Sequence, residues 1–273
     1  MNIRGDKLYD LDCPMIMGII NLTPDSFYKE SRLGNSSRIL ERIEAMVLAG
    51  AQIIDVGGVS TRAGADLLTS EEELNRIIPV IGAIRKLYPN ILISVDTFRA
   101  DVAKEAVQNG ANIINDVYAG RFDDQMFDTV AELQVPYILM HSRGDASNMQ
   151  DLCQYHDVAE EVCLELSESL QLLRSKGVKD VIIDPGFGFA KNLEQNYELF
   201  RNLDLLKILD CPILLGVSRK SMIYKLLDST AQEALNGTSV LNALGLMNDA
   251  AIIRVHDVKE ANEVAKIVSM LKK

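Results

Sequence analysis

The sequence predicts a (β/α)₈ barrel in one domain, and three observations support this. The length of 273 residues suits one such barrel, which typically needs about 250 residues. Eight short apolar runs, each bounded by turn residues, predict strands that are covered on both faces. Amphipathic helical segments separate these runs through the whole chain, with no linker and no low-complexity tract. The alternative is a doubly wound open sheet, which has the same alternation of strands and helices.

Each predicted strand is rich in aliphatic residues and ends at a turn. The predicted strands are residues 15–21, 51–57, 91–96, 111–117, 136–141, 180–184, 212–218 and 251–256. Among the helices between them, the segment that starts at Ser70 opens with a predicted capping box of Ser70 and Glu73. We therefore expect one barrel domain over residues 1–273.

Composition and charge narrow the function. The formal net charge is −11 and the basic residues are dispersed, which argues against nucleic acid and anionic membranes as partners. The four cysteines form no CxxC pair, which is typical of reduced thiols in a cytoplasmic protein. No apolar run has the roughly 20 residues of a membrane span, and the first residues lack the apolar core of a signal peptide. We expect a soluble, cytoplasmic protein.

All eight predicted strands end in or just before polar residues. In a barrel these ends meet at the carboxyl-terminal face, where enzymes of this fold build their active sites. A single polar residue there is as well explained as a helix N-cap, and Asp55, Asp116 and Asp257 are open to that reading. Eight polar endings from eight strands indicate a site. The residues are Asn21, Asp55, Asp96, Asn115 with Asp116, His141, Asp184, Ser218 to Lys220, and Arg254 to Asp257.

These residues separate into two groups by charge. The first supplies acceptors and one amide, which suit a flat heterocycle with an N–H and amino edge: Asp96, Asn115 and Asp184. The second supplies donors that suit an anion at a helix start: Arg62, Lys220, Arg254 and His256. The sequence thus predicts one pocket for a heterocycle joined to an anionic group.

Familiar alternatives lack their motifs. There is no GxGxxG and no GxxxxGK[ST], which argues against Rossmann and P-loop nucleotide binding. There is no HxH or HExxH of a zinc hydrolase. A Ser–His–Asp hydrolase remains open on residue inventory alone, although no GxSxG elbow is present.

Seven segments together resemble the dihydropteroate synthase family, over nearly the whole chain from Met17 to Ala261. They are "MGIINLTPDSF", "IIDVGGVSTRAGA", "ISVDTFRADVAKEAVQNGANIINDV", "LMHSRG", "DPGFGFAKN", "LLGVSRKSMI" and "IIRVHDVKEA". The resemblance implies a (β/α)₈ barrel, usually a homodimer and a target of sulfonamides. It also implies condensation of p-aminobenzoate with 6-hydroxymethyl-7,8-dihydropterin diphosphate, with release of pyrophosphate and 7,8-dihydropteroate in folate biosynthesis, assisted by Mg²⁺.

The resemblance also implies roles for single residues. Asp96, Asn115 and Asp184 match the pterin-binding residues, with Asp184 at the 2-amino and N3–H edge. Lys220 matches the residue between the pterin and p-aminobenzoate, and Ser221 lies next to it.

The anionic end of the substrate has its own set of matching residues. Arg254 and His256 match residues that hold the diphosphate, joined by Thr61 and Arg62 from a loop. Asn21 matches a Mg²⁺ ligand. The family precedent is departure of pyrophosphate before the amine attacks, which gives a pterin cation that Asp96 would stabilise.

Several loop positions depart from the family pattern. Tyr28–Arg32 stands where a glycine-rich turn is common, Val59 where Glu is usual, Ala63 where Pro is usual, and Ser142 where Met is common. We expect these changes to affect affinity for p-aminobenzoate and sulfonamides more than the reaction. Two other functions fit part of the pattern: a pterin-binding methyltransferase, which has no need of "SRKS", and a non-catalytic pterin-binding paralogue.

Overall fold

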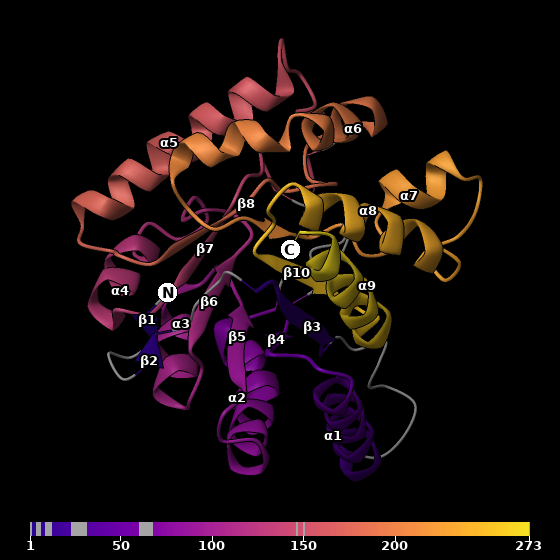
Figure 1. The fold of residues 1–273 in the computed structure, drawn as a ribbon. Helices are drawn as coiled ribbons and strands as arrows, with labels where there is room; N and C mark the ends of the chain where they lie inside the picture. Colours follow the sequence, from indigo (N-terminus) through magenta and orange to yellow (C-terminus); the bar gives the residue numbers. More distant parts are fainter. Residues whose placement is uncertain are drawn as a thin grey trace.

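Eight parallel strands form the centre of the molecule in a computed structural model, which describes residues 2–3, 7–8, 13–22, 32–59, 68–145, 147–149 and 151–272 (Figure 1). They are β3 (Met15–Asn21), β4 (Ile53–Gly57), β5 (Leu92–Asp96), β6 (Ile113–Asp116), β7 (Tyr137–Met140), β8 (Val181–Asp184), β9 (Leu214–Leu215) and β10 (Ile252–Val255). They lie in the order β8-β7-β6-β5-β4-β3-β10-β9. A parallel bridge between Ile183 and Ile213 joins the two ends of this order, so the sheet closes into a barrel.

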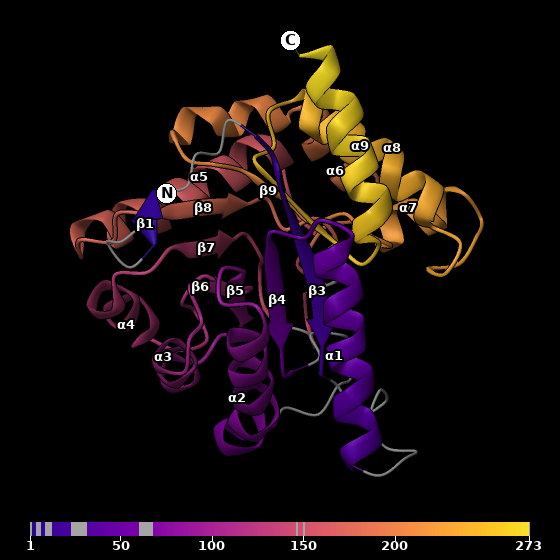
Figure 2. The same cartoon turned by 60° about the horizontal axis from the view of Figure 1, so that its bottom comes forward.

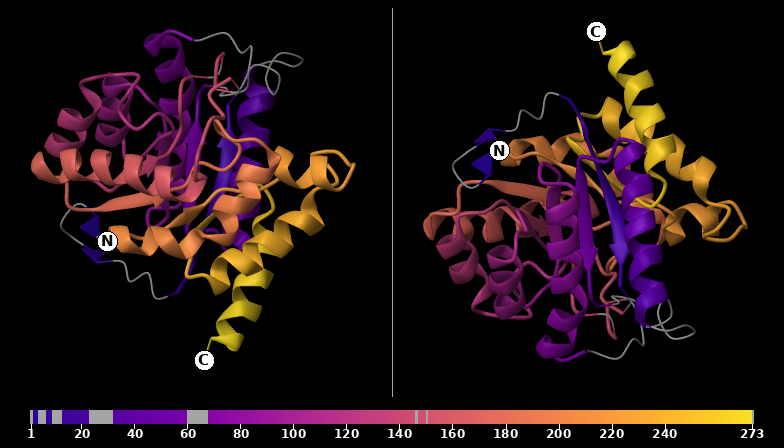
Figure 3. Two further views of the ribbon diagram at one scale, coloured as in Figure 1. Left: turned by 90° about the horizontal axis from the view of Figure 1, so that it is seen from above. Right: turned by 90° about the horizontal axis from the view of Figure 1, so that it is seen from below.

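Helices follow the strands and cover the outside of the barrel (Figures 1 and 2). The two chain ends lie toward the end of the barrel where the strands begin (Figure 3). A short antiparallel pair, β1 (Asn2–Ile3) and β2 (Lys7–Leu8), stands apart from the barrel sheet. The helices are α1 (Arg32–Leu48), α2 (Ser70–Leu87), α3 (Ala100–Gln108), α4 (Met126–Leu133), α5 (Val158–Ser175), α6 (Leu193–Arg201), the 3₁₀ helix η2 (Leu203–Leu209), α7 (Ser221–Leu226), α8 (Leu235–Met247) and α9 (Val258–Leu271).

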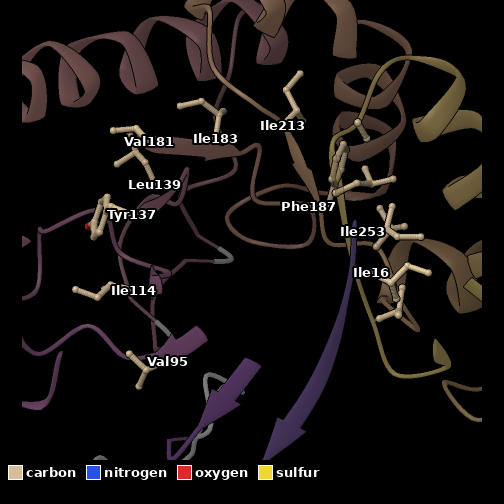
Figure 4. Packing of buried hydrophobic residues seen from close by; sticks show 14 of the residues in the cluster. Ile16, Val95, Ile114, Tyr137, Leu139, Val181, Ile183, Phe187, Ile213 and Ile253 are labelled. Carbon is tan, nitrogen blue, oxygen red and sulfur yellow. The ribbon is translucent and has the colours of Figure 1, made fainter. Parts of the chain in front are cut away.

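The outer faces of the strands form the main hydrophobic core with the helices. Alternate residues such as Ile16, Val95 and Ile114 point outward and pack in this layer (Figure 4). Each of these side chains is at most 1% exposed. Burying one such side chain stabilises the fold by about 1.5–3 kcal/mol, so this layer fixes the helices on the barrel.

A second, smaller apolar cluster fills the inside of the barrel near the strand starts. It takes at least one residue from every one of the eight strands, which is the layered filling expected of a closed barrel. Its members are Met15, Met17, Ile53, Leu92, Ile113, Ile138, Ile182, Leu214 and Ile252.

The structure confirms the predicted (β/α)₈ fold, with two local differences. The predicted strand 212–218 forms ladder pairs only at Leu214–Leu215. The capping box lies one residue earlier than predicted: Thr69 is the N-cap, it accepts the Glu72 backbone N–H at 3.2 Å, and Glu72 accepts the Thr69 backbone N–H at 2.9 Å. Glu73 is fully buried and pairs with Arg99 instead. Within the described residues, no helix has the length and apolarity needed to span a membrane.

Candidate active site

The polar residues at the strand ends lie directly above the inner apolar cluster. Side chains on one face of a strand recur every second residue. The next inward positions on four strands therefore lie two residues beyond Ile53, Ile113, Ile182 and Ile252, and all four are polar. These positions are Asp55, Asn115, Asp184 and Arg254, and Asp96 lies four residues beyond Leu92.

Arg254 is the centre of this polar layer. Its Nε lies 2.7 Å from Asp55 Oδ2, and its Nη2 lies 2.6 Å from Asp96 Oδ2. Burial lowers the pKa of Arg254, but the carboxylates of Asp55 and Asp96 outweigh it and raise that pKa above its ordinary value. The guanidinium is thus a permanent cation, with 18% of its side chain still exposed.

Asp55 is a site residue that the sequence left open as a helix cap. It is fully buried, it binds Arg254, and it accepts the Asn115 Nδ2–H group at 3.2 Å. The signal was available in the sequence, because Asp55 lies two residues before the last residue of its strand and so cannot cap the following helix. Asp55 orients both Arg254 and Asn115.

Buried Asp184 and partly buried Lys220 are two opposite charges that influence each other in a second part of the layer. Asp184 is 4% exposed, and its Oδ1 accepts the Gly186 N–H at 2.8 Å. Burial raises the pKa of Asp184, and the Lys220 ammonium and the Gly186 N–H oppose that rise. Burial lowers the pKa of Lys220 to about 8, against the attraction of Asp184. Lys220 also donates to the carbonyl of Phe187, and its Nζ lies 4.7 Å from the centre of the Phe189 ring.

Asp96 is a carboxyl group of this layer whose pKa lies near neutral pH. Burial raises its pKa to about 7, and Asp55 acts in the same direction while Arg254 opposes it. A carboxyl group in this state changes its protonation near neutral pH. Position 57 is glycine, so no side chain stands between Asp96 and Asn21: a Cβ there would lie 3.3 Å from Asp96 Cβ and 3.6 Å from Asn21 Oδ1.

His256 is held by Ser218. The Ser218 hydroxyl accepts the His256 backbone N–H at 3.1 Å and lies 3.0 Å from His256 Nδ1. Burial, helped by Arg254, lowers the pKa of His256 to about 4, so the ring is neutral at pH 7. A neutral ring that accepts the Ser218 O–H at Nδ1 carries its own proton on Nε2. That N–H is a donor for a ligand.

The remaining predicted site residues lie as follows. Ser221 is the first residue of α7, directly after Lys220, and Asn21 is the exposed last residue of β3. Thr61 and Arg62 lie outside the described residues, as do Ala63 and most of the Tyr28–Arg32 segment. No group of three or more His, Cys, Asp or Glu among the described residues is arranged to hold a metal ion.

Three of the polar strand ends do not face the barrel interior. His141 follows Leu139 on the outer face of β7, and its Nε2 lies 3.1 Å from Glu165 Oε2 of α5. Asp116 accepts the Tyr137 O–H at 2.7 Å and two loop N–H groups, so it orders the turn after β6. Asp257 makes no side-chain cap bond and instead pairs with Arg219 at 2.8 Å.

The closed barrel and the charged layer at its carboxyl-terminal mouth together define an enzyme of the (β/α)₈ class. A family model described as "Pterin binding enzyme" matches residues 17–256. The dihydropteroate synthase of Clostridium beijerinckii is 40% identical over 98% of this chain and 95% of its own length. The dihydropteroate synthase of a Streptococcus pyogenes strain is 42% identical over 94% of this chain and 95% of its own length.

Solved structures agree with these relatives. A Yersinia pestis dihydropteroate synthase, solved with a sulfonamide drug complex, superposes with a TM-score of 0.92 and 37% identity over 100% of this chain and 98% of its own. A Xanthomonas albilineans enzyme with 4-aminobenzoic acid gives 0.88 and 36%, over 96% of this chain and 94% of its own. A Pneumocystis carinii folic acid synthesis protein is 42% identical over 92% of this chain, which spans 35% of that longer protein. The chain belongs to the pterin binding enzymes and, among them, to the dihydropteroate synthases, which are transferases.

Proposed function

We propose that this site condenses p-aminobenzoate with 6-hydroxymethyl-7,8-dihydropterin diphosphate, releasing pyrophosphate and 7,8-dihydropteroate for folate biosynthesis. The observation that supports this reaction most directly is the polar layer inside the barrel. Buried acceptors, on Asp184 and Asn115, stand in the same layer as the cation Arg254. A heterocycle with an N–H edge matches the acceptors, and an anionic substituent on it matches the cation.

The acceptors bind the heterocycle. Asp184 accepts from the amino and N3–H edge of the pterin, with its carboxylate aimed by the Gly186 N–H. Asn115, oriented by Asp55, offers its remaining amide capacity to the same ring. Lys220 stands beside Asp184 and donates to the carbonyl side of the pterin, near the entry of the second substrate.

The donors bind the diphosphate. Arg254 offers the guanidinium and His256 its Nε2–H, and Thr61 and Arg62 are expected to join them. Arg254 is shared by two carboxylates, whose combined charge would repel an anion if both were ionised. The raised pKa of Asp96 removes part of that repulsion, because a protonated Asp96 leaves only Asp55 as counter-ion.

A magnesium ion fits this site only together with the diphosphate. Asn21 offers one amide oxygen, and Mg²⁺ commonly binds through one or two protein ligands plus phosphate oxygens and water. When bound, Mg²⁺ neutralises charge on the leaving diphosphate. Arg254 and His256 do the same from the protein side. Because the pKa of Asp96 is about 7, Asp96 can lose its proton after the diphosphate has bound, and its ionised form stabilises the positive charge that develops on the pterin.

Purified protein tests the proposal directly. Incubation with 6-hydroxymethyl-7,8-dihydropterin diphosphate, p-aminobenzoate and Mg²⁺ should release pyrophosphate in equal amount to 7,8-dihydropteroate. Release should depend on p-aminobenzoate. A protein that binds the pterin but releases no pyrophosphate would be a non-catalytic paralogue, and one that transfers methyl groups instead would be a methyltransferase.

We also propose that two copies associate through α8. Val240, Leu244 and Met247 recur at helical spacing on α8 and are 52%, 49% and 46% exposed. A helix that is apolar on its outward face as well as its inward face is typical of an interface. Leu244→Glu should convert a dimer to a monomer in sedimentation velocity, whereas Leu172→Glu on α5 should not. A monomeric parent protein would contradict the expectation.

Three further expectations complete the proposal. Every described element except the β1–β2 pair belongs to the barrel or its helical layer, so we treat residues 1–273 as one pterin-binding domain. All four cysteines are free, which suits the reducing cytoplasm. We expect a sulfonamide to compete with p-aminobenzoate here, and the similar Yersinia pestis enzyme was solved with a sulfonamide drug complex.

A further inference from the structure

Lys191 is a buried cation with no assigned role in the reaction. It is 3% exposed. Its Nζ lies 3.0 Å from the carbonyl oxygen of Gly186, 3.0 Å from that of Phe189 and 2.9 Å from His141 Nδ1. An ammonium group has three N–H donors, so these three acceptors satisfy it completely. None of the three is a carboxylate, which is unusual for a buried charge.

His141 is oriented to receive Lys191. Because Nδ1 accepts from the ammonium, the ring proton lies on Nε2 and is donated to Glu165 Oε2 at 3.1 Å. Burial and the charge of Lys191 lower the pKa of His141 to about 4, which keeps the ring neutral and Nδ1 free to accept. Glu165 is held in turn by Arg143 Nε at 2.9 Å. The histidine that accepts from Lys191 is therefore held in place by a residue of α5.

The loop that Lys191 holds is the one that presents Asp184 to the barrel interior. Gly186 has a φ of +70°, and a Cβ there would collide with the carbonyl oxygen of His141, so the loop lies directly against the end of β7. The N–H of Gly186 binds Asp184 Oδ1, and the carbonyl of Phe187 accepts from Lys220. Two lysines thus bind the carbonyls of one loop, Lys220 beside Asp184 and Lys191 beside His141.

A lysine placed only for stability would gain little here. Burial and the nearby Lys220 lower the pKa of Lys191 to about 7, and Asp184 and Glu165 oppose that shift. A methionine would fill the same space without the cost of desolvating a charge. What methionine cannot do is bind two carbonyls, at positions 186 and 189, that lie on either side of Phe187 and so set the path of the loop.

We propose that Lys191, seated on His141, is a positioning residue for pterin recognition: it fixes the 185–190 loop so that the carboxylate of Asp184 meets the heterocycle. The inference rests on the proposed pterin site at Asp184. It assigns to His141, which does not face the barrel interior, a part in substrate binding through Lys191.

Ligand binding separates this role from a structural one. The probes are 6-hydroxymethyl-7,8-dihydropterin, which reaches only the heterocycle subsite, and pyrophosphate with Mg²⁺, which reaches only the diphosphate subsite that contains Arg254 and His256. Lys191→Met should weaken the affinity for the pterin by about tenfold or more, since misplacing a functional group by about 1 Å can cost 100-fold. The affinity for pyrophosphate should change by less than twofold. The control Lys207→Met removes an exposed lysine paired with Asp249 and should change neither.

A double-mutant cycle with Asp184→Asn tests whether Lys191 acts through Asp184. If it does, adding Lys191→Met to Asp184→Asn costs little further pterin affinity, because the group that Lys191 positions is already lost. If Lys191→Met instead lowered the pterin affinity by the same factor with and without Asp184→Asn, and also weakened pyrophosphate binding, Lys191 would have a general structural role and the proposal would be overturned. Parent protein that fails to bind the pterin would instead reject the proposed function itself.

Two variants of His141 keep the test decisive if Lys191→Met does not fold. In His141→Asn the amide oxygen stands near the place of Nδ1 and can still accept from Lys191. His141→Leu offers no acceptor. We expect pterin affinity within about threefold of the parent for His141→Asn and a loss of about tenfold for His141→Leu, with pyrophosphate affinity unchanged in both. Equal pterin affinity in the two variants would contradict the positioning role.

Discussion

The inside of the barrel holds two layers of side chains that come from the same strands but differ in polarity and charge. The lower layer, near the strand starts, is aliphatic and contains Ile53, Ile182 and Ile252. The upper layer contains Asp55, Asp184 and Arg254, which lie two residues further along these three strands. The distance between the layers is only about 6.6 Å at the ordinary rise of a strand. One step of the two-residue repeat thus separates the hydrophobic core from the candidate active site.

The contrast shows how a barrel supports buried charge. The lower layer is sealed by side chains from all eight strands, so the charges above it are desolvated from below but open to ligands from above. Desolvation raises the pKa of Asp96 and Asp184 and lowers that of Lys220 and His256. In the upper layer burial thus opposes the charged forms of these groups, and we expect a charged, hydrogen-bonding substrate to offset that cost, while the lower layer supplies stability.

The largest effect should come from removing the central cation of the upper layer. Arg254→Met leaves Asp55 buried without its counter-ion, and breaking one side of such a pair costs about 3 kcal/mol of unfolding free energy. Turnover should fall by at least ~100-fold, because a preorganised donor to the leaving group is gone. Urea unfolding and pyrophosphate release measure the two effects.

A second substitution separates these two losses. In the double variant Asp55→Leu with Arg254→Met the unpaired charge is absent, so much of the unfolding free energy should return while turnover stays low. If stability did not recover, the loss in the single variant would come from packing and not from the unpaired carboxylate. If turnover recovered, Arg254 would have no place in the reaction.

Two substitutions on β8, one in each layer, test whether the lower layer supplies stability and the upper layer binds substrate. Ile182 belongs to the lower layer and is 1% exposed. Ile182→Ala should lower the unfolding free energy by about 3 kcal/mol through lost burial and the cavity left behind. The KM and kcat of the folded enzyme should change by less than twofold. A large change in KM would mean that the layers are coupled and would break the comparison.

Asp184→Asn is the reciprocal change two residues further along β8. The substitution keeps the shape but places an amide donor against the donors of the pterin edge. Pterin affinity should fall by about 2 kcal/mol in calorimetry, with the unfolding free energy nearly unchanged. Near-parent affinity would remove Asp184 from the pterin site. A large loss of stability would mean that Asp184 is held mainly for the fold.

The sequence predicts the fold well because strand length and alternation depend on local pattern. The first strand, residues 15–21, is predicted with its observed bounds. The seventh predicted strand is too long, because Pro212 lacks an N–H and the chain after Leu215 turns toward Lys220. The capping box shifts by one residue because Glu73 is drawn into the interior by Arg99, a partner 26 residues away. Such long-range pairing has no local signal.

The site was predictable wherever parity along a strand decides the direction of a side chain. Counting in twos from Ile53 would have placed Asp55 inside the barrel, and counting from Leu139 would have placed His141 outside. Lys191 could not be found in this way, because it lies in a loop and its partners come from three different segments. The roles expected of all the predicted site residues stay predictions, for Asp184 and Arg254 inside the barrel as for Thr61 and Arg62.

The smallest effect concerns how Asp96 responds to pH. Its pKa is raised to about 7 in the folded protein, mainly by burial, whereas an unfolded aspartate titrates near 3.9. Between these values the folded state binds more protons than the unfolded state, so Asp96 lowers stability as the pH rises. Compared with Asp96→Asn, which does not titrate, the parent should lose roughly 1 kcal/mol or more of unfolding free energy between pH 5 and pH 8.

The exposed Asp249 provides the control for this measurement. Lys207 and Lys272 lower the pKa of Asp249, so this group titrates below pH 5 in both the folded and the unfolded protein. The difference in unfolding free energy between the parent and Asp249→Asn should therefore stay constant from pH 5 to pH 8. If the difference for Asp96→Asn were equally constant, Asp96 would be ionised throughout this range. Asp96 would then be hydrated like a surface residue, and desolvation would no longer distinguish its part of the upper layer.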